Sequence, residues 1–119
     1  MSIVITTDQL DRLREARARE FRDRMVLRLT TDFAPELAHH GVDDATAMVE
    51  DGMEAAKTYG LTRRGAVRRF LETMAILGPG FHEEEDWARD TLRDPVLSQT
   101  TKMDRIAGAA IFSDRRMKR

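Results

Sequence analysis

The spacing of the apolar residues constrains this fold more than any other feature of the sequence. The clearest case lies between Thr62 and Gly78, where apolar residues recur at intervals of three and four, as on one face of an α-helix. These residues are Val67, Phe70, Leu71, Met74 and Leu77. No alternating apolar run is longer than residues 3–5, and no repeat of about 20 to 50 residues occurs, so the sequence predicts an all-α fold.

A long first helix is predicted to begin near Thr7. Thr6 and Gln9 have the spacing of a capping box, in which two side chains satisfy free backbone N–H groups at a helix start. The positions expected to face inward are Leu10, Leu13, Phe21, Met25, Leu29 and, beyond a bend, Phe33. The acid-to-base pairs expected on its outer faces are Asp8/Arg12, Glu15/Arg19 and Glu20/Arg24.

Proline and glycine residues divide the middle of the chain. Pro35 suits the first turn of a short helix that ends at Gly41, because glycine tolerates the left-handed backbone found there. Asp43 or Asp44 is expected to cap the next helix, which Gly60 ends. Its inward positions are Ala45, Met48, Val49, Gly52, Ala56 and Tyr59. The small residues among them allow another helix to approach closely.

Three further helices are predicted in the second half. Thr62 should cap the helix with the clear apolar face, and Gly78-Pro79-Gly80 should end it. A short helix is expected over residues 83–93, and Ser98 or Thr100 should start the last helix. The inward positions of that last helix are Met103, Ile106, Ala107, Ala110 and Ile111. The result is a compact irregular bundle of four longer and two short helices, with mostly antiparallel neighbours.

The composition fits one helical domain over residues 1–119, with an ordered core at 6–112 and a frayed basic tail at 113–119. Hydrophobic residues make up 41% and charged residues 34%, which is too apolar for disorder and too charged for a membrane span. The chain has no cysteine and its N-terminus lacks a signal-peptide pattern. These features are compatible with a cytoplasmic protein, whose secretion would require another protein as carrier.

Two histidine-containing stretches raise the question of a metal site. His39 and His40 are adjacent, and neighbouring side chains on a helix point about 100° apart, so they do not readily face one ion. His82 precedes four carboxylates, residues 83–86, but contiguous helical carboxylates also fan out around the axis. A solvated helix start explains that acidic run, so no metal and no cofactor are predicted.

The remaining candidates are surfaces. No set of nucleophile, base and orienting group can be identified, so we expect no enzyme. The four clustered arginines suit an ordinary solvated face or contact with an acidic protein, and nucleic acid fits less well at a net charge of −1. They are Arg63, Arg64, Arg68 and Arg69. At the helix break, Phe81 and Trp87 flank the acids Glu83, Glu84 and Asp86. Each of these two rings, like that of Tyr59, either packs in the core or anchors an interface. For any one of the three rings, a core position is the favoured interpretation.

Several segments resemble a group of small helical accessory proteins encoded in bacterial type VI secretion effector clusters. In order they are ITTDQLDRLREARAREF, GVDDATAMVEDGMEAAKTYGLT, VRRFLETMAILGPGFHEEEDWARDTLRDP and KMDRI, and they span most of the chain. The most specific pieces are Tyr59-Gly60, the break at residues 77–81 and WARDTLRDP at 87–95. The resemblance implies an adaptor or co-chaperone that helps load an effector onto the secretion spike, and it implies no catalytic residues.

Three functions therefore stand as hypotheses. The first is a protein-binding adaptor or co-chaperone whose partner is the effector, its chaperone or a spike component. The second is an immunity protein that binds and blocks a toxin. The third is a nucleic-acid-binding regulator that uses the clustered arginines. In each case the apolar helix faces can also be buried in a homodimer.

Overall fold

The chain is all-α in the part that the structure describes. In a computed structural model, residues 6–117 are described, and their side chains through residue 111. The helices are α1 (Thr7–Asp32), α2 (Ala34–His39), α3 (Ala45–Thr58), α4 (Arg64–Leu77), α5 (Phe81–Glu84), α6 (Asp86–Arg93) and α7 (Gln99–Met117). No strand occurs within residues 6–117, which confirms the predicted fold class. None of the described helices combines the length and apolar character that crossing a membrane requires.

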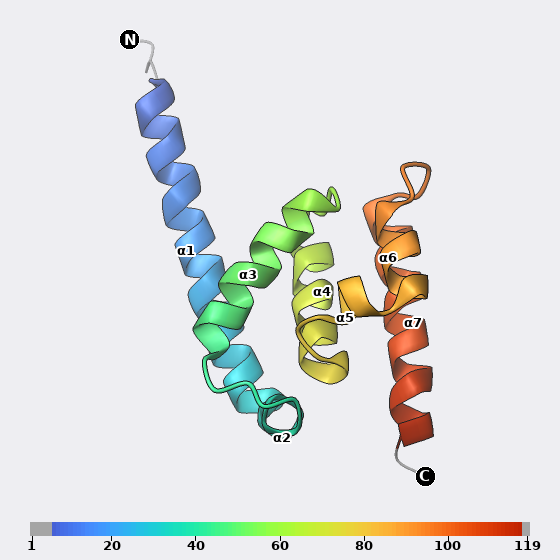
Figure 1. The fold of residues 1–119 in the computed structure, drawn as a ribbon. Coiled ribbons are helices and arrows are strands. Elements are labelled where there is room, and N and C mark those ends of the chain that lie inside the picture. The colour runs from blue at the N-terminus through green and yellow to red at the C-terminus, as the bar shows by residue number, and fades with distance from the viewer. Residues whose placement is uncertain (1–5, 118–119) are drawn as a thin grey trace.

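The helices are arranged around α4, which stands between α3 and α7 (Figure 1). The second half of α1 packs against α3, and α2 turns back toward α4, while α5 and α6 connect α4 to α7. The radius of gyration is 16.0 Å and the longest dimension is 65 Å. A compact chain of this length would have a radius of gyration of about 13.5 Å, so the molecule is elongated. The first half of α1 accounts for the extension, because it projects beyond the other helices (Figure 1).

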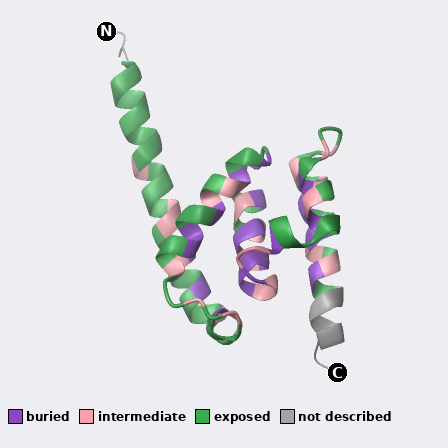
Figure 2. Cartoon of the chain, viewed as in Figure 1, coloured by how far each residue is buried: buried purple, intermediate pink, exposed green. Residues whose placement is uncertain are grey.

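The core is centred on the aromatic ring of Phe70 in α4. That ring lies 6.0 Å from the ring of Tyr59 and 5.5 Å from the rings of both Phe81 and His82. The predicted inward face of α4 is largely confirmed, since Phe70, Leu71 and Met74 are buried and the other two positions are half-buried. In Figure 2 the buried residues gather on α4 and on the helix faces turned toward it.

Most of the predicted helix ends are confirmed. Thr6 and Gln9 form the capping box, with the Thr6 N–H donating to Gln9 Oε1 over 3.0 Å and the Gln9 N–H donating to Thr6 Oγ1 over 3.2 Å. Asp44, rather than Asp43, caps α3 by accepting from the Ala47 N–H at 3.0 Å. The helix-ending glycines adopt positive φ values: Gly41 68°, Gly60 75° and Gly78 109°.

The cap predicted for α4 is wrong, because Arg63 rather than Thr62 is the N-cap and makes no side-chain cap hydrogen bond. The residues just before the helix are held instead by a side chain of α7. Gln99 Oε1 accepts from the backbone N–H groups of Thr62 and Arg63, at 2.8 and 2.9 Å, and its Nε2 donates to Thr62 Oγ1 at 2.7 Å. One amide side chain thus satisfies two backbone donors and a hydroxyl. The neighbouring Lys102 Nζ donates to the Tyr59 carbonyl at 3.0 Å. The first turn of α7 therefore holds the link between α3 and α4.

The inward face predicted for α1 is wrong in its first half. Leu10 and Leu13 are 37% and 45% exposed, and every residue from 6 to 20 is exposed except the half-buried Ala16 (Figure 2). The second half matches the prediction, since Met25 and Leu29 are buried. The physical reason is length: α1 has 26 residues and α3 has 14, so α3 cannot cover all of α1. Of the three predicted ion pairs on α1, only Glu20–Arg24 comes within range among the described atoms, at 3.9 Å.

Two other differences concern the last third of the chain. The single helix expected over residues 83–93 is divided into α5 and α6 by the extended backbone of Glu85. Ile111, expected to face inward, is 56% exposed, because no described helix covers that side of α7. Ser98 does precede α7 and accepts from the Thr101 N–H at 3.1 Å. The helix continues to Met117, past the expected end of the ordered core, and residues 118–119 of the predicted tail lie outside the described part.

Gly52 in α3 packs tightly against side chains of α4. A Cβ added there would lie 2.6 Å from Met74 Sδ and would also collide with Leu71 Cδ2, and both of those side chains are buried. We expect Gly52→Ala to lower the free energy of unfolding by about 1 kcal/mol or more, since overpacking costs more than the gain in helix propensity returns.

Gly108 supplies the matched control for this substitution. It lies in α7, is exposed, and has no atom within 4 Å of the position that a Cβ would take. Gly108→Ala should therefore raise the free energy of unfolding by about 0.5 to 1 kcal/mol. Urea denaturation measures the free energy of unfolding of both variants. An increase for Gly52→Ala would contradict the close contact.

Candidate partner-binding surfaces

The predicted docking corner at the helix break is divided by the fold. Phe81 is 1% exposed and packs against Phe70, so it is a core residue and not a surface anchor. Trp87, at the start of α6, is 36% exposed. The two rings differ because α5 turns Phe81 under α4, whereas α6 begins after the break at Glu85. The prediction that joined them in one binding corner is therefore corrected.

The acidic residues of that corner remain on the surface beside Trp87. Glu83, Glu84 and Asp86 are all exposed. Asp86 Oδ1 forms an ion pair of 2.8 Å with Arg89 Nη2 on the next turn, and such exposed pairs contribute little to stability. What the structure retains of the predicted corner is one exposed indole with carboxylates around it.

His82 is buried, although the sequence suggested a solvated helix start. The Tyr59 hydroxyl and His82 Nδ1 share a hydrogen bond of 2.8 Å beneath Phe70, and His82 is 8% exposed. His40 also has a structural role, since its Nε2 donates to the Ile76 carbonyl at 2.8 Å, while the adjacent His39 is exposed. Among the described residues, no three histidine or carboxylate side chains converge closely enough to hold a metal ion.

The buried hydroxyl of Tyr59 makes the stability of the fold depend on pH in the alkaline range. Burial raises the pKa of this hydroxyl above its ordinary value of 10.0; Glu83 also raises the pKa, whereas Arg93 and Arg89 oppose the shift. Above pH 10.0 the unfolded chain therefore loses a proton that the folded chain keeps, so the free energy of unfolding should fall as the pH rises through this range.

The chain offers a direct measurement because it has 1 tyrosine. The ultraviolet absorbance of the phenolate should show a higher titration midpoint for the folded chain than for the chain unfolded in urea. Tyr59→Phe should remove this contribution to the alkaline loss of stability. Equal midpoints in the folded and unfolded chain would contradict the assigned burial.

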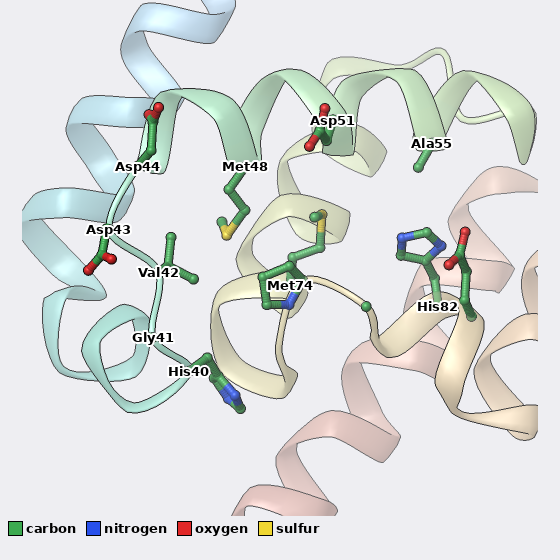
Figure 3. A pocket seen from close by; sticks show the side chains of 13 residues that line it. His40, Gly41, Val42, Asp43, Asp44, Met48, Asp51, Ala55, Met74 and His82 are labelled. Carbon is green, nitrogen blue, oxygen red and sulfur yellow. The ribbon is translucent and has the colours of Figure 1, made fainter.

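An acidic cleft of about 570 Å³ opens between α3 and the loops that follow α2 and α4. Its carboxylates come from Asp43, Asp44, Asp51 and Glu83, and Met48 and Met74 lie between Asp43 and Asp44 at one end and His82 at the other (Figure 3). No lysine or arginine lines it within the described residues. The cleft therefore offers an apolar floor and negative charge to a cationic group. The sequence did not reveal it because its residues lie on segments far apart in the chain.

The predicted arginine patch is partly neutralised by carboxylates. Arg69 Nη1 pairs with Asp104 Oδ1 at 2.8 Å, and Arg68 Nε lies 3.4 Å from Glu72 Oε1. Arg63 and Arg64 are exposed and form no ion pair with any described residue. The four arginines therefore do not act as one free cationic surface.

A groove of about 430 Å³ lies between α1, α3 and the start of α4, and we call it the basic groove. Its residues come from both sides of the α3–α4 link and from the middle of α1. They are Arg14, Arg17, Ala18, Phe21, Met53, Lys57, Leu61, Thr62, Arg64 and Val67. Every charged residue in this set is basic. Sequence analysis placed only Arg64 of these charged residues in a candidate surface, because three helices contribute to the groove.

The chain was compared with models of protein families, with curated proteins and with solved structures. None of the three comparisons finds a match.

Proposed function

We propose that this chain is a non-enzymatic protein-binding module, acting as an adaptor or co-chaperone in the loading of a type VI secretion effector. The observation that carries the proposal is the first half of α1, which projects from the bundle with Leu10 and Leu13 exposed. The resemblance of the sequence to accessory proteins of effector clusters supplies the biological setting. A cytoplasmic location in bacteria belongs to the same proposal.

The projecting part of α1 suits a binding role because it is already helical. An isolated helix of about 12 to 15 residues is marginal in water, since nucleation is costly. Here the second half of α1 is held against α3, and the first half extends an existing helix from the capping box at Thr6. A partner would therefore meet a preformed surface, which reduces the conformational entropy lost on binding.

Co-expression with the products of neighbouring genes tests the proposal. The intact chain should purify with an effector, its chaperone or a spike component. The double variant Leu10→Asp/Leu13→Asp should lose this partner, because charged groups replace the exposed leucines. Leu27→Asp is the matched control, since Leu27 is 68% exposed on the same helix. A chain that captures none of these products would contradict the proposal.

The cellular role has its own measurement. Deletion of the chain should prevent delivery of the effector and leave self-protection intact. Loss of self-protection without loss of delivery would identify an immunity protein instead.

The acidic cleft favours immunity as a second candidate function. Its carboxylates would complement a cationic active site of a toxin, and charge complementarity of this kind speeds association. Asp43 and Asp51 are exposed, and their side chains form no ion pair with the described residues. Asp43→Lys/Asp51→Lys should then weaken binding to the toxin and abolish protection, whereas Leu10→Asp/Leu13→Asp should preserve both.

A further inference from the structure

We propose that the basic groove binds an acidic amphipathic helix of the partner protein, an inference that rests on the proposed binding function and names the chemistry of its ligand. The groove combines an apolar floor with a rim of cations. A helix with leucine-like residues on one face and carboxylates on both sides of that face matches both features.

The floor of the groove consists of apolar side chains that the fold only partly covers. Phe21 in α1, Met53 in α3 and Val67 in α4 are each half-buried, so each turns one side to the core and leaves another open to the groove. Leu61, which also lines it, is 1% exposed and closes the base. Apolar side chains of a ligand would remove the remaining surface from water, at about 25 cal/mol per Å².

The rim carries positive charge that the chain itself does not balance. Arg14, Arg17 and Arg64 form no ion pair with the described residues, and Lys57 pairs only with exposed Glu54, at 3.4 Å on its own helix. The whole chain has a formal net charge of −1, so the excess of cations is local to this groove. Carboxylates of a ligand are the complementary groups.

A smaller groove of about 280 Å³ continues past Phe21 and shares Arg64. Its other three cations all lie beside acids. Arg24 lies 3.9 Å from Glu20, and Arg28 Nε and Arg68 Nε lie 3.1 and 3.4 Å from the shared Glu72 Oε1. Of the cations that line these two grooves, those without an ion pair to a described residue therefore all line the basic groove.

The face of α1 that lines the groove continues beyond it toward the start of the helix. Leu10, Arg14, Arg17 and Phe21 follow one another at intervals of four, three and four, which places them on one face of the helix. From Leu10 to Phe21 this face is about 16 Å long, or about three helical turns. A ligand helix of that length could contact the groove floor with one end and Leu10 with the other.

The apolar floor favours a protein ligand over nucleic acid. A phosphodiester backbone matches the cations but has no apolar face to cover Met53, Leu61 and Val67. The half-buried ring of Phe21 is the only aromatic side chain among the described residues that line the groove, so they offer no platform for the successive stacking that single-stranded nucleic acid uses.

Fluorescence anisotropy with synthetic peptides tests the assignment on the intact chain. The probe is a labelled helix of about five turns, with leucines along one face and glutamates beside them. Its control peptide has the same composition in an order that scatters the leucines around the helix. The matched protein variants are Arg14→Glu/Arg17→Glu, in the groove, and Arg12→Glu/Arg19→Glu, on the opposite face of the same helix, with an identical change in net charge.

The intact chain should bind the amphipathic probe at least about tenfold more tightly than the scattered peptide. Arg14→Glu/Arg17→Glu should lower the affinity for the probe by about tenfold or more, while Arg12→Glu/Arg19→Glu should change it less than about twofold. These four residues are exposed, so neither variant should alter the unfolding midpoint. Equal binding of both peptides, equal losses in both variants, or no binding of the probe would overturn the proposal.

Other occupants give other results. Tighter binding of a short DNA or RNA duplex than of the probe, lost with Arg14→Glu/Arg17→Glu, would make the groove a nucleic-acid site and overturn the proposal. Sedimentation that shows a dimer dissociated by the same variant would make the occupant a second copy. If Arg14→Glu/Arg17→Glu still captures the co-expressed partner, the groove assignment fails and the adaptor function stands. Probe binding without any captured partner would mean that the groove assignment stands and the adaptor function fails.

Discussion

Replacement of Phe70 by alanine should lower the free energy of unfolding by about 3 to 5 kcal/mol, which is the usual cost of removing a buried phenylalanine. The ring is fully buried and contacts the rings of Tyr59, Phe81 and His82, which come from two other segments of the chain. Those rings are fixed by α3 and α5, so they cannot readily collapse into the cavity. Because small domains are stable by about 5 to 15 kcal/mol, the variant should unfold at a markedly lower urea concentration.

Leu27→Ala supplies the control for Phe70→Ala. Leu27 is 68% exposed on α1, so its truncation should change the free energy of unfolding by no more than about 0.5 kcal/mol. Far-UV circular dichroism during urea denaturation measures both variants with the same signal. An unchanged midpoint for Phe70→Ala would mean that α4 presents a different face to the core.

Phe81→Ala and Trp87→Ala should have opposite profiles, although the two residues flank the same acidic run. Phe81→Ala should cost about 3 to 5 kcal/mol of stability, because its ring is 1% exposed and packs against Phe70. Trp87→Ala should cost about 1 kcal/mol or less, since its side chain is 36% exposed at the start of α6. Urea denaturation followed by circular dichroism suits both, because Trp87→Ala removes the only tryptophan. Equal losses of stability would contradict the division of the predicted corner.

The features that the sequence predicted well are those that depend on a few neighbouring residues. The capping box at Thr6 and Gln9 requires only local hydrogen bonds, and it forms as expected. Gly41 ends its helix with the positive φ that its lack of a side chain permits. The inward face of α4 was also predictable, because helix geometry alone determines which residues share a face.

The features that could not be predicted depend on contacts between distant segments. Gln99 binds the backbone N–H of Thr62, just before α4 and 37 residues away in the sequence, and no local pattern marks an amide side chain for that role. His82 is buried because Tyr59, 23 residues earlier, supplies its hydrogen bond. Leu10 lies on the expected face of α1, but periodicity reveals only which side is apolar and not whether another helix is long enough to cover it. The basic groove was missed for the same reason, since it exists only where three helices meet.

The projecting half of α1 has a consequence for how this sequence can change over generations. Residues there touch little else in the bundle, so substitution is limited mainly by helix propensity, and most exchanges should cost less than about 0.5 kcal/mol. Substitutions at α4 face a much stricter limit, because its inner side chains are enclosed on several sides. Substitutions that the fold tolerates should therefore accumulate on the projecting face sooner than in the core. A chain built in this way can acquire a new partner while its fold stays the same.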